Sequence, residues 1–386
     1  MKSRGLATTA LCMLITVVGC GQAASHSSLG ETGPKGLVSP SPSVHSAPSD
    51  LLGVQTLPQA WTTPLLDAVT DGSQIVWSKG GGDSQIGAPD LWTYAPGDDG
   101  PKLVYRGVNR DAQLMPIAVS HGKYAFEESF SYPDGSTGWS LWLMESMDST
   151  PVLVDSSLKD PHDLAAPAVW ISLTRDRLIW NALHQSAAGP HFYLRDYEFA
   201  DSTTRNLADS DATQTQYWFP DADDSGRLVY STVENTSGTT AFHVYFAQLG
   251  SGPFHPRRLD SDGYATEPVL SGGNVVWKTT DGNVGNPGQL IRYSLSTGSS
   301  SPMPMDGLSI SNETAGNRFV TGWTDHTLFE LYDLKTNSTV VVERHDPTAP
   351  EGVVRPYVGG DMVVFVRILD ASNANLQLCW LRLSPG

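Results

Sequence analysis

The stretch Gly273-Asn274-Val275-Val276-Trp277 is a tight turn followed by a short strand of β-branched and aromatic residues. Six related stretches occur along the chain, namely 71–77, 122–126, 176–180, 226–230, 316–320 and 360–365. A Gly- or Asp-containing turn that leads into such residues predicts one arm of a β-hairpin. The sequence therefore contains seven copies of one hairpin, and this repetition decides the fold class.

The spacing of the seven copies indicates which repeat fold they form. The equivalent positions Trp77, Phe126, Trp180, Tyr230, Trp277, Thr321 and Phe365 are 49, 54, 50, 47, 44 and 44 residues apart. This period is typical of a four-stranded propeller blade. We name the blade's strands a to d, where b is the hairpin arm above. We expect an all-β propeller of about seven four-stranded blades; a pair of β-sandwich domains is the alternative.

The connections between the expected strands differ in length. The a-to-b and c-to-d turns are mostly short, while the b-to-c and d-to-a connections are mostly long. Alternate connections of an up-and-down blade lie at opposite ends, so the long connections should share one face, where propellers usually bind ligands. The last unit lacks a strand d, and residues 51–57 could supply it. We therefore expect an N-terminal strand to close the ring and remove an exposed edge.

The composition agrees with a turn-rich β fold and excludes some partners. The 386 residues include 37 Gly and 26 Pro, and only 17% are charged. The net charge is −17, and it becomes −19 once an N-terminal signal carrying Lys2 and Arg4 is removed. A surface this acidic repels nucleic acid and anionic lipid headgroups. We expect no nucleic-acid partner.

The N-terminus has the features of an export signal. Lys2 and Arg4 precede the uncharged run 6–18, whose 13 residues suit a signal-peptide core and are too few for a membrane span. The run ends in Val17-Val18-Gly19-Cys20, which resembles a lipobox. That resemblance implies cleavage before Cys20 and lipidation of its thiol. An ordinary secretory signal with an incidental cysteine is the alternative.

The residues after Cys20 cannot form a core. Gly, Ser and Pro supply 16 of the 30 positions from 21 to 50, and no aromatic residue occurs there. We therefore expect a signal peptide over 1–19, a lipidated cysteine and flexible tether over 20–50, and the propeller over 51–386. The protein should be exported and held by its lipid on the extracytoplasmic side of the cell envelope. Cys379 is expected to be a buried thiol, and no disulfide is expected.

Two stretches carry a family resemblance. Leu331-Tyr332-Asp333-Leu334-Lys335-Thr336-Asn337 and Ile291-Arg292-Tyr293-Ser294-Leu295-Ser296-Thr297-Gly298 resemble a strand of TolB-type, WD40-like repeats. The resemblance extends from about residue 64 to the end and implies a β-propeller. The chain departs from the pattern, since a Ser-Pro-Asp-Gly turn is not present in every blade and seven blades exceed TolB's six. The resemblance implies the fold and none of TolB's partners.

No local catalytic motif is present, whether a Gly-x-Ser-x-Gly elbow, a His-Glu-x-x-His pair, a phosphate loop or a Cys-x-x-Cys pair. No cofactor is expected. Residues 221–226, Asp-Ala-Asp-Asp-Ser-Gly, resemble half of a calcium loop, but Thr232 stands where the bidentate Glu belongs. An ordinary a-to-b turn is the favoured interpretation. Residues 217–219, Tyr-Trp-Phe, could stack on a sugar or a partner, although packing between sheets is favoured.

Aspartates recur in the expected d-to-a connections. The candidates for an acidic ligand rim are Asp111, Asp163, Asp211, Asp262, Asp306 and Asp346, with Asp160, Asp209 and Asp260 beside them. Gathered on one face, they would attract cations or basic groups. Asp also favours turns through its own backbone hydrogen bonds, so a turn-forming role is the alternative.

These features favour a binding or interaction module over an enzyme. The expected partner is a protein, glycan or small molecule at the long-loop face, with the membrane contacted only through the lipid anchor. A propeller hydrolase or lyase acting on polysaccharide is the alternative function, since propeller enzymes assemble sites from several blades without a local motif.

Overall fold

The computed structural model describes most of the chain after the expected tether. The described residues are 45–46, 53–80, 88–108, 112–131, 137–157, 170–186, 189–236, 238–250, 252–261, 263–279, 288–305, 318–324, 327–346, 348, 352–370 and 375–383. They belong to one compact unit that runs from Pro42 to Gly386. The expected signal peptide, Cys20 and all of the tether except 45–46 lie outside the described residues.

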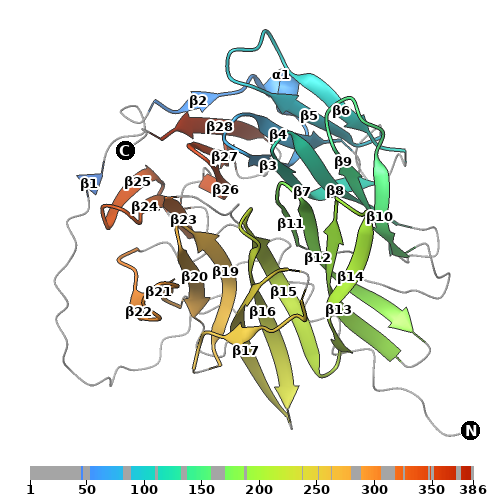
Figure 1. Ribbon diagram of the computed structural model, residues 1–386. Coiled ribbons are helices and arrows are strands. Elements are labelled where there is room, and N and C mark those ends of the chain that lie inside the picture. The colour runs from blue at the N-terminus through green and yellow to red at the C-terminus, as the bar shows by residue number, and fades with distance from the viewer. Residues whose placement is uncertain are drawn as a thin grey trace, which may run out of the picture. The chain divides into compact units, whose positions relative to one another are not determined.

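The described residues form a propeller of seven four-stranded sheets, as expected (Figure 1). Blade 1 consists of β3 (Leu65–Thr70), β4 (Ile75–Lys79), β5 (Asp90–Tyr94) and β6 (Lys102–Arg106). Blade 2 consists of β7 (Gln113–Ser120), β8 (Lys123–Ser131), β9 (Thr137–Met144) and β10 (Val152–Ser156). Blade 3 consists of β11 (Ile171–Leu173), β12 (Arg177–Ser186), β13 (Gly189–Glu198) and β14 (Thr203–Asp211). Blade 4 consists of β15 (Thr215–Ala222), β16 (Arg227–Thr236), β17 (Thr239–Gln248) and β18 (Arg257–Arg258).

Blade 5 consists of β19 (Ala265–Ser271), β20 (Asn274–Thr279), β21 (Leu290–Ser294) and β22 (Ser300–Pro302). Blade 6 contains β23 (Phe319–Thr324), β24 (Leu328–Asp333), β25 (Ser338–Arg344) and β1 (His45–Ser46). Blade 7 contains β26 (Gly352–Gly359), β27 (Met362–Ile368), β28 (Leu376–Arg382) and β2 (Gln55–Thr56). The helix α1 (Gln59–Thr62) has four residues, and no helix among the described residues is long and apolar enough to cross a membrane.

The repeated hairpin arm forms the buried centre of each sheet. In blade 1, Ile75, Val76 and Trp77 of β4 are all fully buried. Both faces of such a strand are covered because each sheet packs between two neighbouring sheets. This explains why strand b is a continuous apolar run rather than an alternating one.

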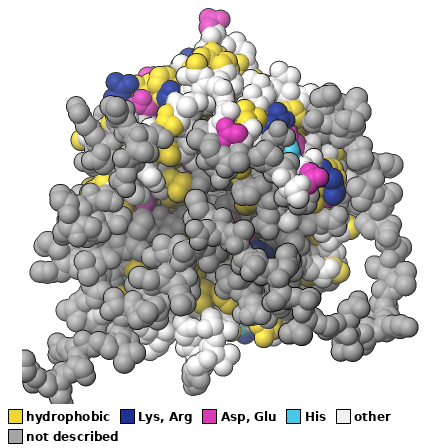
Figure 2. All heavy atoms as spheres, turned by 180° about the vertical axis from the view of Figure 1, so that it is seen from behind, with side chains coloured by type: hydrophobic (Ala, Val, Ile, Leu, Met, Phe, Trp, Pro, Cys, Tyr) yellow, Lys and Arg dark blue, Asp and Glu magenta, His cyan; other side chains and the backbone are white. Residues whose placement is uncertain are grey.

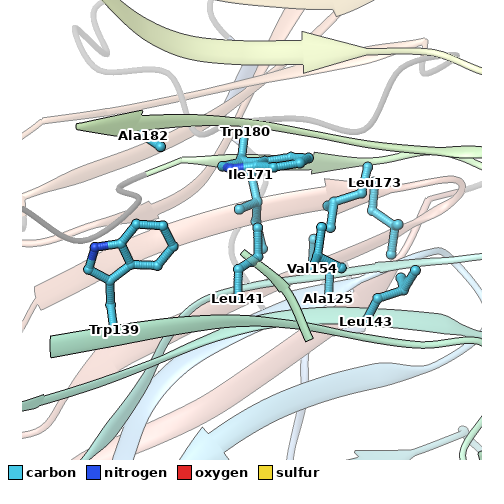
Figure 3. Packing of buried hydrophobic residues seen from close by; sticks show 11 residues of the cluster. Ala125, Trp139, Leu141, Leu143, Val154, Ile171, Leu173, Trp180 and Ala182 are labelled. Atoms are coloured by element: carbon cyan, nitrogen blue, oxygen red, sulfur yellow. The ribbon is translucent and has the colours of Figure 1, made fainter. Parts of the chain in front are cut away.

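The core lies between the blades. Between blades 2 and 3, Trp139 and Leu141 of β9 face Trp180 and Ala182 of β12, and Figure 3 shows the two sets of side chains pointing toward each other. Trp139, Leu141 and Trp180 are fully buried. Tryptophan side chains of the repeats therefore pack between neighbouring sheets, which is the role that the sequence analysis favoured for the aromatic residues.

Strand a carries side chains that bond to the next blade. The Asp67 carboxylate accepts the Ile117 N–H at 3.4 Å, and the Asp221 carboxylate accepts the Leu270 N–H at 2.6 Å. In each case the receiving strand has a bulge, at 114–117 or 266–269. These bonds satisfy backbone donors that the bulges release from the sheet ladder.

Segments near the two ends of the chain meet in blade 7. β2 pairs antiparallel with β28, with Gln55 opposite Trp380, and the Leu57 N–H donates to the Leu378 carbonyl at 2.9 Å. β1 pairs parallel with β25, an edge pairing that the sequence did not predict. Blades 7 and 1 also approach closely, since a Cβ built at Gly359 would lie 2.0 Å from the Thr70 carbonyl oxygen. That this junction fastens the ring stays a prediction.

The loop lengths correct one expectation. The b-to-c connections of blades 3 and 4 are short, because β12 runs to Ser186 and β13 begins at Gly189, while β16 runs to Thr236 and β17 begins at Thr239. The polar sequence there was expected to be loop, but it extends the strands to ten residues each. Long strands thus replace long loops in two neighbouring blades.

Candidate functional site

The b-to-c and d-to-a connections of every blade lie at the same end of its sheet, which we call the loop end. Three carboxylates occur there, at or just after β10 of blade 2, β18 of blade 4 and β25 of blade 6: Asp155, Asp260 and Glu343. Each of them is almost fully buried, and each contacts one histidine and one arginine. We call these three groups the carboxylate clusters. Buried charges need such partners, because an unpaired one is costly.

The blade 2 cluster joins two sheets. The Asp155 carboxylate accepts hydrogen bonds from Arg195 Nη1 at 2.6 Å and from Trp180 Nε1 at 2.9 Å, and His184 Nε2 lies 3.6 Å away. Burial alone would raise the pKa of Asp155, but the nearby His184 imidazole and the charge of Arg195 outweigh it and lower this pKa to about 2. Asp155 is therefore a carboxylate at neutral pH.

Aromatic rings extend the blade 2 cluster toward solvent. Arg195 lies over the ring of Tyr193, 4.6 Å from its centroid, and the rings of His184 and His191 flank the same tyrosine. His191 in turn contacts the half-exposed Asp209 at 3.0 Å. A strip of polar and aromatic groups thus leads from buried Asp155 to the surface at the loop end.

The blade 4 cluster is centred on Asp260, which follows β18. Its carboxylate accepts the Val244 N–H at 2.7 Å, His243 Nδ1 at 2.9 Å and the Gly263 N–H at 3.3 Å. Arg258 Nη2 lies 3.4 Å from the same carboxylate. Asp260 therefore fixes both the connection after strand d and the orientation of the His243 ring.

The blade 6 cluster joins blades 6 and 7. Arg367 of β27 makes an ion pair with Glu343 of β25, and His345 Nε2 lies 3.1 Å from the other carboxylate oxygen. Glu343 of blade 6 thus takes an arginine from the next blade, as Asp155 of blade 2 takes Arg195 from blade 3. Each of the two clusters thus links two neighbouring blades through a buried ion pair.

The structure describes two of the six predicted rim residues. Asp211 and Asp346 are exposed, and each accepts the backbone N–H and the hydroxyl of a threonine two residues later, Thr213 and Thr348. The hydrogen bonds from Thr213 lower the pKa of Asp211. Both aspartates stabilise turns. Asp111, Asp163, Asp262 and Asp306 lie outside the described residues.

The space-filling view is consistent with paired rather than gathered charges. In Figure 2 the described acidic side chains that are visible stand singly, several of them beside basic ones. Sequence reasoning did not single out Asp155 and Glu343, because they lie at the ends of strands and not in the connections. The sequence feature that could have identified Asp155 and Glu343 is a charged residue at the end of an otherwise apolar strand.

Two other candidates have structural roles. Asp223, within the stretch that resembles a calcium loop, accepts the Ser225 and Arg227 N–H groups, both at 3.0 Å, and so forms the favoured turn. Burial raises the pKa of Asp221 well above its usual value. No group of three or more metal-ligating side chains occurs in the described part of the chain.

The aromatic stretch 217–219 packs against neighbouring sheets. The ring of Phe219 lies 4.2 Å from that of Trp170 and the ring of Trp218 lies 4.9 Å from it, measured between centroids, while Tyr217 contacts Tyr230. This is the packing role that was favoured over ligand stacking.

Comparison with known proteins supports the fold alone. No protein-family model matches the sequence, and no curated protein is significantly similar to it. The β-propeller domain of the Trilobed protease from Pyrococcus furiosus is similar in structure, with a TM-score of 0.55 and 8% identity over 79% of this chain and 91% of that one. The Pyrococcus horikoshii acylaminoacyl peptidase gives a TM-score of 0.53 and 10% identity over 80% of this chain.

This chain covers 50% of the acylaminoacyl peptidase, so it spans about half of that protein's length. TolB from Acinetobacter baumannii also matches, with a TM-score of 0.43 and 13% identity over 70% of this chain and 63% of that one. The seven four-stranded sheets and the two peptidase propellers confirm the expected resemblance to propeller repeat proteins at the level of the fold.

Proposed function

We propose that this protein is a lipid-anchored, extracytoplasmic binding module that presents the loop end of its propeller to a ligand or partner. The observation that carries the proposal is the position of the three carboxylate clusters. All of them lie at the loop end, at the boundaries or edges of different blades, although apolar packing would serve stability equally well there. Charged groups kept at such a cost at one end of a rigid scaffold are a candidate for recognition.

The sequence supports the location. The tripartite signal and Cys20 favour a lipid anchor, and the Gly-, Ser- and Pro-rich stretch 21–50 would give the propeller a reach of about 30 Å from the membrane. A tethered domain can meet a partner in the envelope at a high effective concentration.

Site-specific photo-crosslinking tests the proposal. A photoreactive amino acid would replace Tyr264, which is 41% exposed just before β19 at the loop end, in the full-length chain expressed in its native envelope. The matched control is Leu103, which is 39% exposed in strand d of blade 1. We expect a discrete adduct from position 264 and none from position 103.

A Cys20→Ser variant of the same crosslinking chain tests the anchor. We expect it to lose membrane retention and the adduct together, since only the lipid holds the protein near its partner. Equal adducts from positions 264 and 103, or unchanged retention of the Cys20→Ser variant, would contradict the proposal.

A further inference from the structure

The outer edge of blade 3 is a long strand to which no further described strand is added. β14 has nine residues, whereas the outermost strands of blades 1, 2, 4 and 5 have five, five, two and three. In the described part of the chain, residues 204–210 make no backbone hydrogen bond to any segment other than β13. Alternate N–H and C=O groups of an edge strand point away from its sheet, so β14 can pair with another strand.

Another blade of the same molecule carries an added strand. β1 comes from the stretch before the repeats and lies parallel to β25 of blade 6, with His45 opposite Val340. It pairs with the outer side of β25, which faces away from β24. An outer edge of this propeller can therefore accept an extended segment, and strand addition of this kind is one mode of peptide recognition by β-sheets.

A cavity lies beside β14. Its volume is about 200 Å³, and residues of β14 and of the c-to-d turn of blade 4 line it. Three of the lining residues, Leu207, Leu249 and Phe254, also pack in one apolar cluster, so the cavity has an apolar side. A cavity of about 150 Å³ can hold a benzene ring. The space beside β14 is therefore sufficient for one apolar side chain.

Two features fix the cavity next to the strand edge. Arg205 of β14 joins its two sides, because Nε donates to the buried Asp196 carboxylate at 2.8 Å and Nη1 donates to the Gly250 carbonyl at 3.0 Å. Leu207 is the extra residue of a β-bulge, since the residues on either side of it have partners in β13 and Leu207 has none. Bulges can re-aim a side chain. A cavity held in this way is formed before a ligand arrives, which lowers the cost of binding.

The charges along β14 favour a basic partner. Asp209 contacts His191 and its side chain is 47% exposed, and Asp211 is exposed as well. The guanidinium of Arg205 is matched by the carboxylate of Asp196. The whole chain carries a net charge of −17, so a second copy would be repelled. A different protein with basic residues is therefore the occupant that the charges favour.

We propose that the outer edge of β14 is a docking site for an extended, basic segment of a partner protein. The segment adds a strand to blade 3, places one apolar side chain in the cavity beside Leu207, and sets basic side chains near Asp209 and Asp211. Main-chain hydrogen bonds supply the affinity in this mode of recognition, and the cavity supplies the specificity. The inference goes beyond the role proposed above for the loop end.

The probe is a capped, fluorescent peptide of sequence Lys-Val-Thr-Leu-Thr-Val-Lys, whose β-branched residues favour an extended strand. Its central leucine represents the apolar side chain, and a lysine at each end allows either strand direction. Binding to the full-length chain is measured by fluorescence anisotropy. We expect a dissociation constant below about 1 mM, and an affinity that falls as salt rises from about 50 to 200 mM, because exposed charges are screened.

Three altered peptides separate strand addition from unspecific attraction. Two copies are methylated on alternate backbone nitrogens, one at the odd and the other at the even positions. Only one of these sets of N–H groups can face β14, so we expect one copy to lose binding and the other to keep it. A third copy, with serine in place of the central leucine, should bind about tenfold more weakly because it leaves the cavity unfilled.

Two protein variants locate the site. Gly252 lines the cavity, and a Cβ built there has no atom within 4 Å, so Gly252→Leu can place its side chain in that space. We expect this variant to bind the peptide about tenfold more weakly. The matched control is Gly100→Leu in the c-to-d turn of blade 1, where a Cβ also has no atom within 4 Å. It should bind as the wild type does.

The proposal is overturned if the peptide does not bind the wild type below about 1 mM, if the two methylated copies bind equally, if salt leaves the affinity unchanged, or if Gly252→Leu binds like the wild type. Analytical ultracentrifugation tests the other occupant. We expect a monomer, and a dimer that Gly252→Leu dissociates would assign the edge to a second copy instead. None of these results depends on the crosslinking outcome at position 264.

Discussion

At the residue scale, the informative groups are the buried charges. Asp155 is 2% exposed and receives Arg195 from a position 40 residues later. A buried carboxylate with a partner contributes to stability only while it is ionised. Such pairs could not be predicted from the sequence, because nothing local relates residues so far apart. Cys379 could be predicted, since its apolar surroundings bury it and burial raises its pKa to about 12.

The lowered pKa of Asp155 predicts a pH dependence. The folded pKa of about 2 lies below the ordinary 3.8, so the stabilisation is complete above pH 4 and is lost as the pH falls toward 2. Asp155→Asn should lower the free energy of unfolding at pH 7 by about 2 kcal/mol and should lose less stability than the wild type between pH 4 and 3. Urea unfolding at pH 7, 4 and 3 measures both effects.

Asp211→Asn is the control for this experiment, since asparagine also forms such turns and Asp211 is exposed. It should unfold like the wild type at pH 7. A variant Asp155→Asn that matches the wild type at all three pH values would show that the Arg195 contact does not stabilise the fold.

At the element scale, the repeat predicted the hairpin arms and the outer strands, because turn residues and apolar runs are local signals. It missed the extension of the strands in blades 3 and 4, where cross-strand pairing overrides a polar sequence. In β12 and β13, for example, His184 pairs with His191 and Gln185 with Pro190, residues that would suit a loop as well.

The close approach of blades 7 and 1 predicts the effect of one methyl group. In Gly359→Ala the new Cβ would meet the backbone carbonyl of Thr70, which cannot move aside as a flexible side chain can. We expect the free energy of unfolding to fall by about 1–3 kcal/mol, as for other overpacked sites. Gly100→Ala is the control, because no atom lies within 4 Å of a Cβ there. Equal melting temperatures for both variants would contradict a tight junction.

At the scale of the whole molecule, the described residues form a propeller of seven four-stranded sheets. The number of blades and the class of fold followed from the period of the sequence. Which side chains from different strands share a face did not follow from that period. Thr232 and His243, for example, lie opposite each other only through the register of β16 and β17.

β2 pairs with β28, and we predict that this pairing fastens the two ends of the ring. Deleting residues 51–57 would expose the edge of β28, whereas deleting 22–43 would remove most of the expected tether and leave β1 in place. Thermal unfolding of the two deletion variants, followed by circular dichroism beside the undeleted chain, is the most direct test. We expect a sharply lower melting temperature for the 51–57 deletion and an almost unchanged one for the 22–43 deletion; equal melting temperatures for the two would contradict a ring fastened by β2.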